Sequence, residues 1–164
     1  MQKYHLSIRI LHWLMATIII AMLTLGFLMD SRFLYDIHKS FGVTILILFF
    51  VRIAARNLTR IPPLPEQIAK RERILAKLGH YSLYALFLLM PISGWLMSNW
   101  AGHPVKLFGL DLFNLVEENK SLGKLAYKAH ETFAYALIII TSLHVLGFLK
   151  HKIVDKLNLL GRIL

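Results

Sequence analysis

The residues of this sequence whose types and spacing could do chemistry are its histidines. The chain has 164 residues, eight of them histidine and none of them cysteine. Without cysteine, the chain has no disulfide, no thiolate ligand for zinc or an iron–sulfur cluster, and no covalent attachment point for c-type haem. Any metal would therefore be held by imidazole, thioether or carboxylate groups.

Five of the histidines fall at two depths along long apolar segments. His130 and His144 lie in one such segment, fourteen residues apart. At about 100° and about 1.5 Å per residue, a helix returns them to nearly the same face about 21 Å apart, so they can serve two stacked sites. His38 lies level with His130, whereas His12 and His80 both lie level with His144.

Two tiers of paired imidazoles on facing helices are what two bis-histidine haems require. Imidazole on both sides of the iron favours electron transfer and leaves no open position for oxygen. Zinc, copper and di-iron sites are less favoured, because the apolar segments contain almost no carboxylates and only the inner tier has three histidines. The remaining alternative is that the histidines are unrelated and sit singly at interfaces or on backbone partners.

Methionines offer a second kind of haem ligand. Met15, Met22 and Met29 recur every seven residues, as do Met90 and Met97. This spacing makes a His/Met-ligated haem conceivable. Thioethers that fill irregular packing space are far commoner.

The elements that must position these histidines are four apolar stretches. Each is comparable to the roughly 20 residues that a helix needs to cross about 30 Å of hydrocarbon. With 57% hydrophobic and 17% charged residues, the composition argues against a soluble globule. We predict an all-α transmembrane four-helix bundle, one domain over residues 1–164, with helices at about 8–29, 37–55, 78–100 and 125–149. The first run is too long for a signal peptide and lacks a small-residue cleavage site after it.

The charges predict the orientation of this bundle. Residues 56–77, with prolines at 62, 63 and 65, are predicted to form an extended polar loop on the side of both termini, and residues 98–124 an ordered loop on the other side. The whole formal excess of +10 falls on the first of these sides. By the positive-inside rule both termini are cytoplasmic, and the basic groups contact anionic lipid rather than nucleic acid.

Several segments together resemble the prokaryotic cytochrome b561 family, and the resemblance spans all four predicted helices. The segments are SIRILHWL at 7–14, IHKSFG at 37–42, LGHY at 78–81, PISG at 91–94, KAHE at 128–131 and LH at 143–144. Similar dihaem subunits serve hydrogenases and formate dehydrogenases. The resemblance implies a multi-pass protein of the bacterial inner membrane with two non-covalent b haems.

Ligand roles follow from the resemblance, residue by residue. It implies that His12 pairs with His144 around the inner haem and that His38 pairs with His130 around the outer one. Depth alone leaves open whether His12 or His80 is the partner of His144. Under the first assignment, His80 would be a haem-edge residue or bind a propionate.

Supporting residues are expected at both ends. The resemblance places His151 near a quinone site, where it could bind a quinone carbonyl and pass a proton, although a plain interfacial histidine is an equal reading. We expect Arg9, Arg52 and Arg56 to pair with haem propionates or simply to anchor the helices at the membrane interface. Gly42 and Gly147 each follow a ligand by about one helical turn, where a missing side chain admits a porphyrin or a neighbouring helix.

The function predicted from these features is electron transfer across the inner membrane to or from the quinone pool. The resemblance implies one specific activity, oxidation of superoxide at the outer face with reduction of ubiquinone. Lys39, Lys124 and Lys128 are expected to draw a small anionic donor to that face, unless they are ordinary solvated charges. The alternative function is a haem-carrying electron-transfer or anchor subunit, with a redox partner protein, in a larger dehydrogenase or hydrogenase-type complex.

Overall fold

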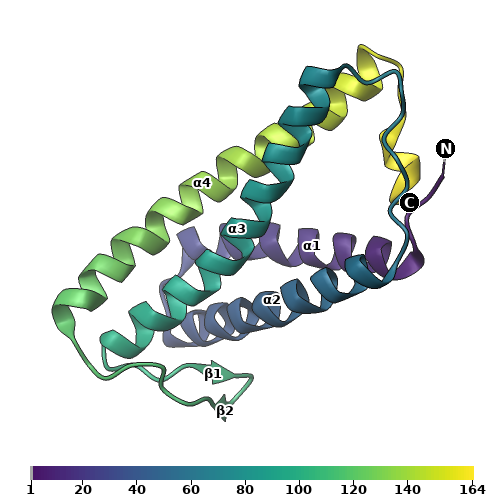
Figure 1. Cartoon of the computed structure of the whole chain (residues 1–164). Helices are drawn as coiled ribbons and strands as arrows, with labels where there is room; N and C mark the ends of the chain where they lie inside the picture. The colour runs from purple at the N-terminus through teal and green to yellow at the C-terminus, as the bar shows by residue number, and fades with distance from the viewer. Residues whose placement is uncertain (1) are drawn as a thin grey trace.

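The computed structural model describes residues 2–164, and four long helices form its framework (Figure 1). These are α1 (Leu6–Leu28), α2 (Arg32–Leu58), α3 (Lys70–Trp100) and α4 (Lys120–Ile153). All four are long and apolar enough to cross a membrane. The predicted all-α transmembrane four-helix bundle is therefore confirmed.

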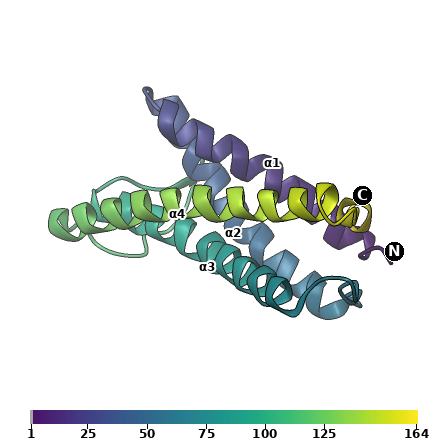
Figure 2. The ribbon, with the colours of Figure 1, turned by 90° about the horizontal axis from the view of Figure 1, so that it is seen from above.

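The four helices are organised as two antiparallel pairs. α3 packs most extensively on α4, α1 packs on α2, and α2 joins the pairs through its contact with α3. The two pairs cross at an open angle (Figures 1 and 2). Because α4 runs the length of the bundle, it can present histidines at both depths to the other helices.

A small apolar core fills the middle of the bundle. Met15 of α1 is its most buried large side chain, with 2% exposed. The core cluster draws on all four helices: Met15, Ile19, Ile45, Phe49, Leu83, Leu86 and Leu137. Along each helix these residues lie between the two histidine levels, so the core separates the two candidate sites. Many other apolar side chains of the helices are exposed, as expected for a surface that faces lipid.

Both termini lie at one end of the bundle, here called the terminal end (Figure 1). The Tyr4 amide donates to the Arg162 carbonyl at 2.9 Å, and Trp13 Nε1 donates to the Ile163 carbonyl at 2.9 Å. Arg162 belongs to a short 3-10 helix, η1 (Leu159–Arg162), and donates to the Pro62 carbonyl at 2.6 Å. These three contacts form a clasp that ties the C-terminus to the N-terminus and to the α2–α3 connection.

The predicted loop at residues 56–77 is wrong in its bounds. α2 continues to Leu58 and α3 begins at Lys70, which leaves residues 59–69 as the connection. The extra turns are stabilised by side chains: Glu72 pairs with Lys150 of α4, and Arg73 Nε donates to the Ile68 carbonyl at 2.8 Å. Polar residues therefore extend the helices beyond the apolar runs that set our predicted bounds. α4 has 34 residues, about 51 Å at about 1.5 Å per residue, well beyond a hydrocarbon core of about 30 Å.

The opposite end of the bundle, the hairpin end, carries a small hairpin that the sequence analysis did not predict. Strand β1 (Lys106–Leu107) pairs with β2 (Leu110–Asp111). The turn between them has positive φ at Phe108 (48°) and Gly109 (95°), a region that glycine adopts freely and a bulky residue such as phenylalanine rarely does. Ser40, buried in α2, offsets this strain: its hydroxyl lies 3.0 Å from the Lys106 carbonyl and accepts from the Phe108 amide at 3.0 Å. The hairpin is thereby fixed to α2.

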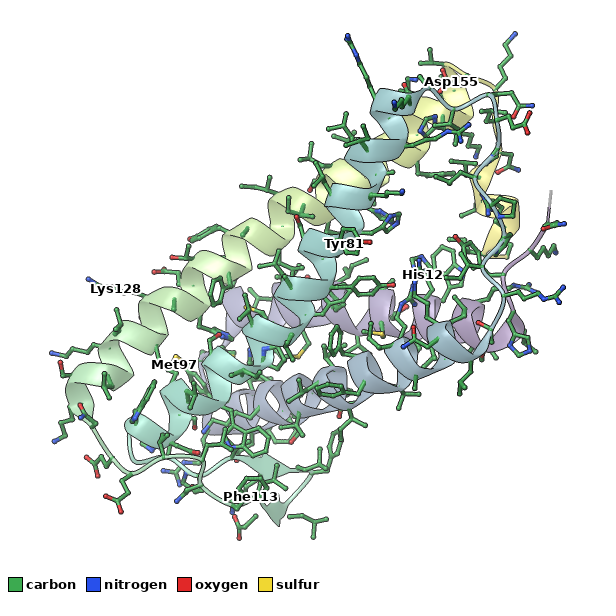
Figure 3. The ribbon with its side chains drawn as sticks, in the orientation of Figure 1. His12, Tyr81, Met97, Phe113, Lys128 and Asp155 are labelled. Carbon is green, nitrogen blue, oxygen red and sulfur yellow. The ribbon has the colours of Figure 1, made fainter. Side chains whose placement is uncertain are left out.

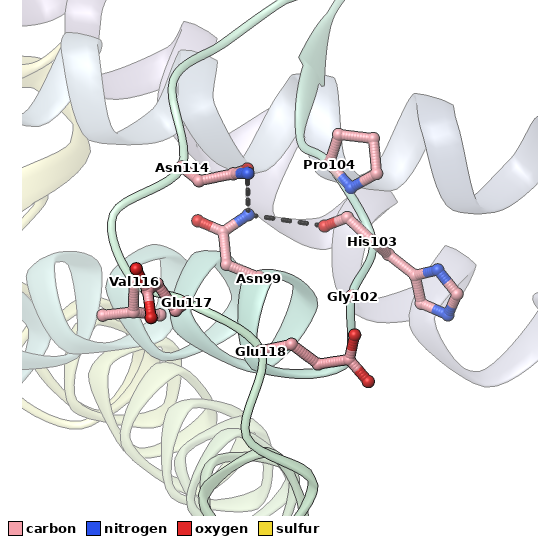
Figure 4. Close-up of a pocket in the computed structure, with 8 residues that line it drawn as sticks. All are labelled: Asn99, Gly102, His103, Pro104, Asn114, Val116, Glu117 and Glu118. Carbon is pink, nitrogen blue, oxygen red and sulfur yellow. Dashed lines mark hydrogen bonds between the residues drawn. The ribbon is translucent and has the colours of Figure 1, made fainter.

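Asn99, at the end of α3, organises the rest of this loop (Figure 4). Its amide nitrogen donates to Asn114 Oδ1 at 3.1 Å, and its carbonyl oxygen accepts from the Leu115 amide at 2.8 Å. A small cavity of about 230 Å³ beside Asn99 is lined in part by Glu117 and Glu118. The predicted ordered loop is thus held by a buried amide side chain.

Candidate functional site

Two pairs of histidines face one another at two levels of the bundle. At the hairpin end, the rings of His38 on α2 and His130 on α4 have centroids 6.3 Å apart. Nearer the terminal end, the rings of His12 on α1 and His144 on α4 have centroids 6.5 Å apart. Figure 3 places His12 on α1. Each pair therefore joins helices from both antiparallel pairs.

These separations fit one metal ion between each pair of rings. A metal–imidazole bond is about 2.0–2.1 Å, and the centre of the ring lies about 1.15 Å from its nitrogens. Two such ligands on opposite sides of one ion place their ring centres about 6.4 Å apart. The separations of 6.3 and 6.5 Å match this value. The ring of His80 lies 5.3 Å from that of His144, which is too close for an ion between them. His80 itself is exposed and lies beside the inner pair.

The backbone and small residues of α3 hold one of these rings. His130 Nδ1 lies 3.0 Å from Ser93 Oγ and 3.0 Å from the Met90 carbonyl. A Cβ added to Gly94 would meet the His130 ring at 3.0 Å, and one added to Gly26 would meet the His38 ring at 3.6 Å. Glycine thus lets both rings of the outer pair lie close to helix backbones.

Several buried polar atoms on the helices that carry the pairs have no hydrogen-bond partner in the described part of the chain. Within residues 2–164, these atoms include His38 Nδ1, Arg9 Nε and Arg52 Nη1. Arg52 Nη2 lies 3.4 Å from His12 Nδ1, at the limit of a hydrogen bond. Buried guanidinium nitrogens without acceptors are costly and call for an anion. The carboxylates of haem propionates would supply it, so Arg9 and Arg52 fit a haem at the inner pair.

His151 lies in an ion-pair cluster at the terminal end. Its Nδ1 is 2.6 Å from Asp155 Oδ2, and Lys150 pairs with both Asp155 and Glu72. The hydrogen bonds from Lys150 and then His151 hold the pKa of Asp155 below its usual value. The cluster brings together three metal-ligating side chains, those of Glu72, His151 and Asp155. Because the Lys150 ammonium already pairs with both carboxylates and leaves one net negative charge, the arrangement is better suited to holding a proton than a divalent cation.

The lysines expected at the outer face do not converge on the outer pair. Lys39 Nζ donates to the Pro104 carbonyl at 3.3 Å and so helps to fix the loop. Lys124 and Lys128 are exposed, and Figure 3 shows Lys128 extending away from the bundle. Any effect on an anionic donor would therefore act through their long-range field rather than through contact.

The expected glycines face open space. A Cβ at Gly147 would meet no atom within 4 Å, and one at Gly42 would meet only Met22 Cε at 4.0 Å. The glycines that do approach a histidine, Gly26 and Gly94, were not singled out for this role, nor was Ser93. The signal available in the sequence was the cluster of small residues after Pro91, on the helix that faces His130.

The fold and the paired histidines define a class: a membrane protein of four long helices whose interior carries candidate metal ligands at two depths. Comparison with known sequences agrees with this class. The family model described as prokaryotic cytochrome b561 matches residues 3–164. The chain therefore belongs to the prokaryotic cytochrome b561 family, whose members are haem b proteins of membrane electron transfer, and it is a multi-pass inner-membrane protein.

Three curated relatives are similar to the chain. Cytochrome b561 homolog 2 of Escherichia coli (strain K12) is 30% identical over 99% of this chain and 92% of the relative. The probable superoxide oxidase CybB of Yersinia pestis is 30% identical over 78% of this chain and 73% of the relative. Cytochrome b561 homolog 1 of Escherichia coli (strain K12) is 24% identical over 79% of this chain and 73% of the relative.

Proposed function

We propose that this chain is a dihaem b cytochrome that moves electrons from a small donor at the hairpin end to ubiquinone near the terminal end. The observation that carries the proposal is the pair of ring separations, 6.3 and 6.5 Å, at two levels of one helix. A haem held by two imidazoles would supply reversible one-electron transfer.

The residues of the chain have distinct roles in this function. His38 and His130 would hold the outer iron, and His12 and His144 the inner one. Arg9 and Arg52, with buried nitrogens that have no partner among residues 2–164, would neutralise propionates at the inner level. The apolar core between the levels excludes water from the path.

Quinone reduction needs protons as well as electrons, and the terminal end has groups to hold them. Each ubiquinone takes up two electrons and two protons to become ubiquinol. His151, hydrogen-bonded to Asp155 at 2.6 Å, can donate a proton to a quinone carbonyl and regain one from water. The basic side of the chain is predicted to face the cytoplasm, so these protons come from the cytoplasm.

We propose superoxide as the electron donor. The support is the similarity to a protein named as a probable superoxide oxidase. Two superoxide anions would each lose one electron to become oxygen, and the two electrons would reduce one ubiquinone. Superoxide crosses hydrocarbon poorly, so its oxidation is expected at the aqueous edge of the outer pair.

Stopped-flow absorbance tests the donor and the acceptor separately. Oxidised protein mixed with superoxide should be reduced faster than superoxide dismutates, and added ubiquinone should reoxidise it. His151→Ala should keep the reduction by superoxide but slow the reoxidation by ubiquinone about tenfold or more. His103→Ala, which removes an exposed histidine from the hairpin-end loop, is the matched control and should change neither rate. Failure of superoxide to reduce the protein would remove this donor.

The hairpin end favours a second candidate function. Phe108, Leu110 and Phe113 are large apolar side chains with 62–70% of their surface exposed. Such a surface suits the docking of a soluble redox protein, as an electron-transfer or anchor subunit of a larger complex would need. Co-purification of a stoichiometric redox subunit from native membranes would favour this function over direct oxidation of a small donor.

A further inference from the structure

One turn of α3 gives His130 a hydrogen-bonding environment of its own. Ser93, with 8% of its surface exposed, donates its hydroxyl proton to the Met90 carbonyl at 2.8 Å. A lone pair of Ser93 Oγ is then free to accept from His130 Nδ1, which lies 3.0 Å away, and the Met90 carbonyl lies 3.0 Å from the same nitrogen. Because both neighbours accept, Nδ1 carries the proton and Nε2 keeps its lone pair for a metal.

Gly94 makes this contact sterically accessible. A Cβ at position 94 would lie 3.0 Å from His130 Cε1 and 3.3 Å from Nδ1. The imidazole therefore occupies the place that a side chain would take. No larger residue fits there unless the ring or the helix moves.

The Nδ1 atoms of the other paired histidines have different surroundings. His38 Nδ1 is buried and has no hydrogen-bond partner within residues 2–164. His12 Nδ1 faces a cation, Arg52 Nη2, at 3.4 Å. Across the four paired rings in that part of the chain, two acceptor oxygens converge only on His130. The two levels are therefore electrostatically unequal.

We propose that Ser93 is a positioning residue that, with the Met90 carbonyl, orients His130 and lowers the reduction potential of the outer haem. This inference rests on the proposed dihaem function. An imidazole N–H becomes a stronger donor when its ring binds ferric rather than ferrous iron, so acceptors at Nδ1 stabilise the oxidised state. If the reduction potential of the outer haem is lowered, transfer of an electron from the outer haem to the inner one becomes more favourable.

Redox titration of the purified holoprotein, followed by visible absorbance, tests the effect. Ser93→Ala removes one of the two acceptors, and it should still bind two haems. At a fixed applied potential, the ratio of reduced to oxidised outer haem should rise about two- to tenfold, the upper figure corresponding to about 59 mV for one electron. Ser93→Thr keeps the hydroxyl and should restore the original midpoint.

Ser98→Ala is the matched control. Ser98 is buried on the same helix, and its hydroxyl donates to a backbone carbonyl, that of His103, at 2.9 Å rather than bonding to an imidazole. Its replacement should leave both midpoints unchanged. An equal shift in Ser98→Ala, or no shift in Ser93→Ala, overturns the proposal.

Two further variants identify the affected haem and separate this proposal from the dihaem function. Ser93→Ala placed in a His12→Ala background, which should retain only the outer haem, should show the same upward shift. Gly94→Ala should displace the ring and change the low-spin electron paramagnetic resonance signal of one haem. A pyridine haemochrome assay giving one haem in the unaltered chain would refute the dihaem function itself, whereas two haems with unshifted midpoints would refute only the role of Ser93.

Discussion

The ring of His80 lies nearer to His144 than the ring of His12 does, yet the shorter distance argues against ligation. At 5.3 Å, the His80 and His144 rings are in edge contact, whereas the 6.5 Å between His12 and His144 leaves room for an iron. Proximity alone would favour His80 as the partner of His144. The room for an iron between the two rings favours His12.

We therefore expect His12→Ala to lose one low-spin haem per chain and His80→Ala to retain both. The reason is that the 6.5 Å between the His12 and His144 rings would leave room for an iron, whereas the 5.3 Å between His80 and His144 would not. Pyridine haemochrome stoichiometry and low-temperature absorbance of the reduced protein measure the outcome. The reverse pattern, with the inner signal abolished in His80→Ala and intact in His12→Ala, would make His80 the ligand.

The depth of each histidine along its helix was predictable from the sequence, but the side-chain contacts of the histidines were not. A helix advances by a fixed rise, so matching His38 with His130 needed only their positions in apolar runs. The contacts of Ser93 and Gly94 with His130 depend on how α3 is rotated against α4, which no single-helix pattern specifies. The role expected for Gly42 and Gly147, to admit a porphyrin or a neighbouring helix, depends on the same rotation, and a Cβ at either position would meet no histidine.

Among the elements, the hairpin shows how tertiary contacts override local preference. Its strands have two residues each, and its turn places a phenylalanine at positive φ, so no strand or turn pattern was visible. The buried hydroxyl of Ser40 supplies what the local sequence lacks. Similarly, the first turns of α3 form because Glu72 and Arg73 find partners outside their own helix.

Ser40→Ala should loosen the hairpin without unfolding the helices. The Phe108 amide would lose its acceptor, a cost of about 1–3 kcal/mol for a buried group. Hydrogen–deuterium exchange should then be about fivefold to a hundredfold faster at the Leu112 amide, which donates to the Val105 carbonyl and does not touch Ser40.

The control for this experiment is Thr44→Ala. Thr44 lies one turn further along α2 and donates to the Ser40 carbonyl at 2.9 Å, within the helix. It should leave exchange in the hairpin unchanged. Unaltered protection of Leu112 in Ser40→Ala would show that the hairpin is held by other contacts.

For the whole molecule, the structure shows both termini at one end but the charges must decide which side of the membrane that end faces. The excess of +10 predicts which side that is. Labelling of single introduced cysteines can test this orientation, because the sequence has no cysteine of its own. Both Pro63 in the α2–α3 connection and Phe113 in the hairpin-end loop are exposed.

A membrane-impermeant maleimide should label Phe113→Cys in intact spheroplasts and Pro63→Cys only after permeabilisation. This labelling pattern is expected from the positive-inside rule, by which basic loops stay in the cytoplasm. Labelling of Pro63→Cys in intact spheroplasts, with Phe113→Cys protected, would invert the topology and with it the direction proposed for proton uptake.

The clasp at the terminal end also has a consequence for folding. It joins Tyr4 to Arg162 and Trp13 to Ile163, residues about 150 positions apart along the chain. Bringing such distant residues together costs more chain entropy than forming a helical turn, so we expect the clasp to close after the four helices have formed. Until it closes, the segment before α1 lacks its hydrogen-bond partners in residues 162–163, which makes closure of the clasp a late step in folding.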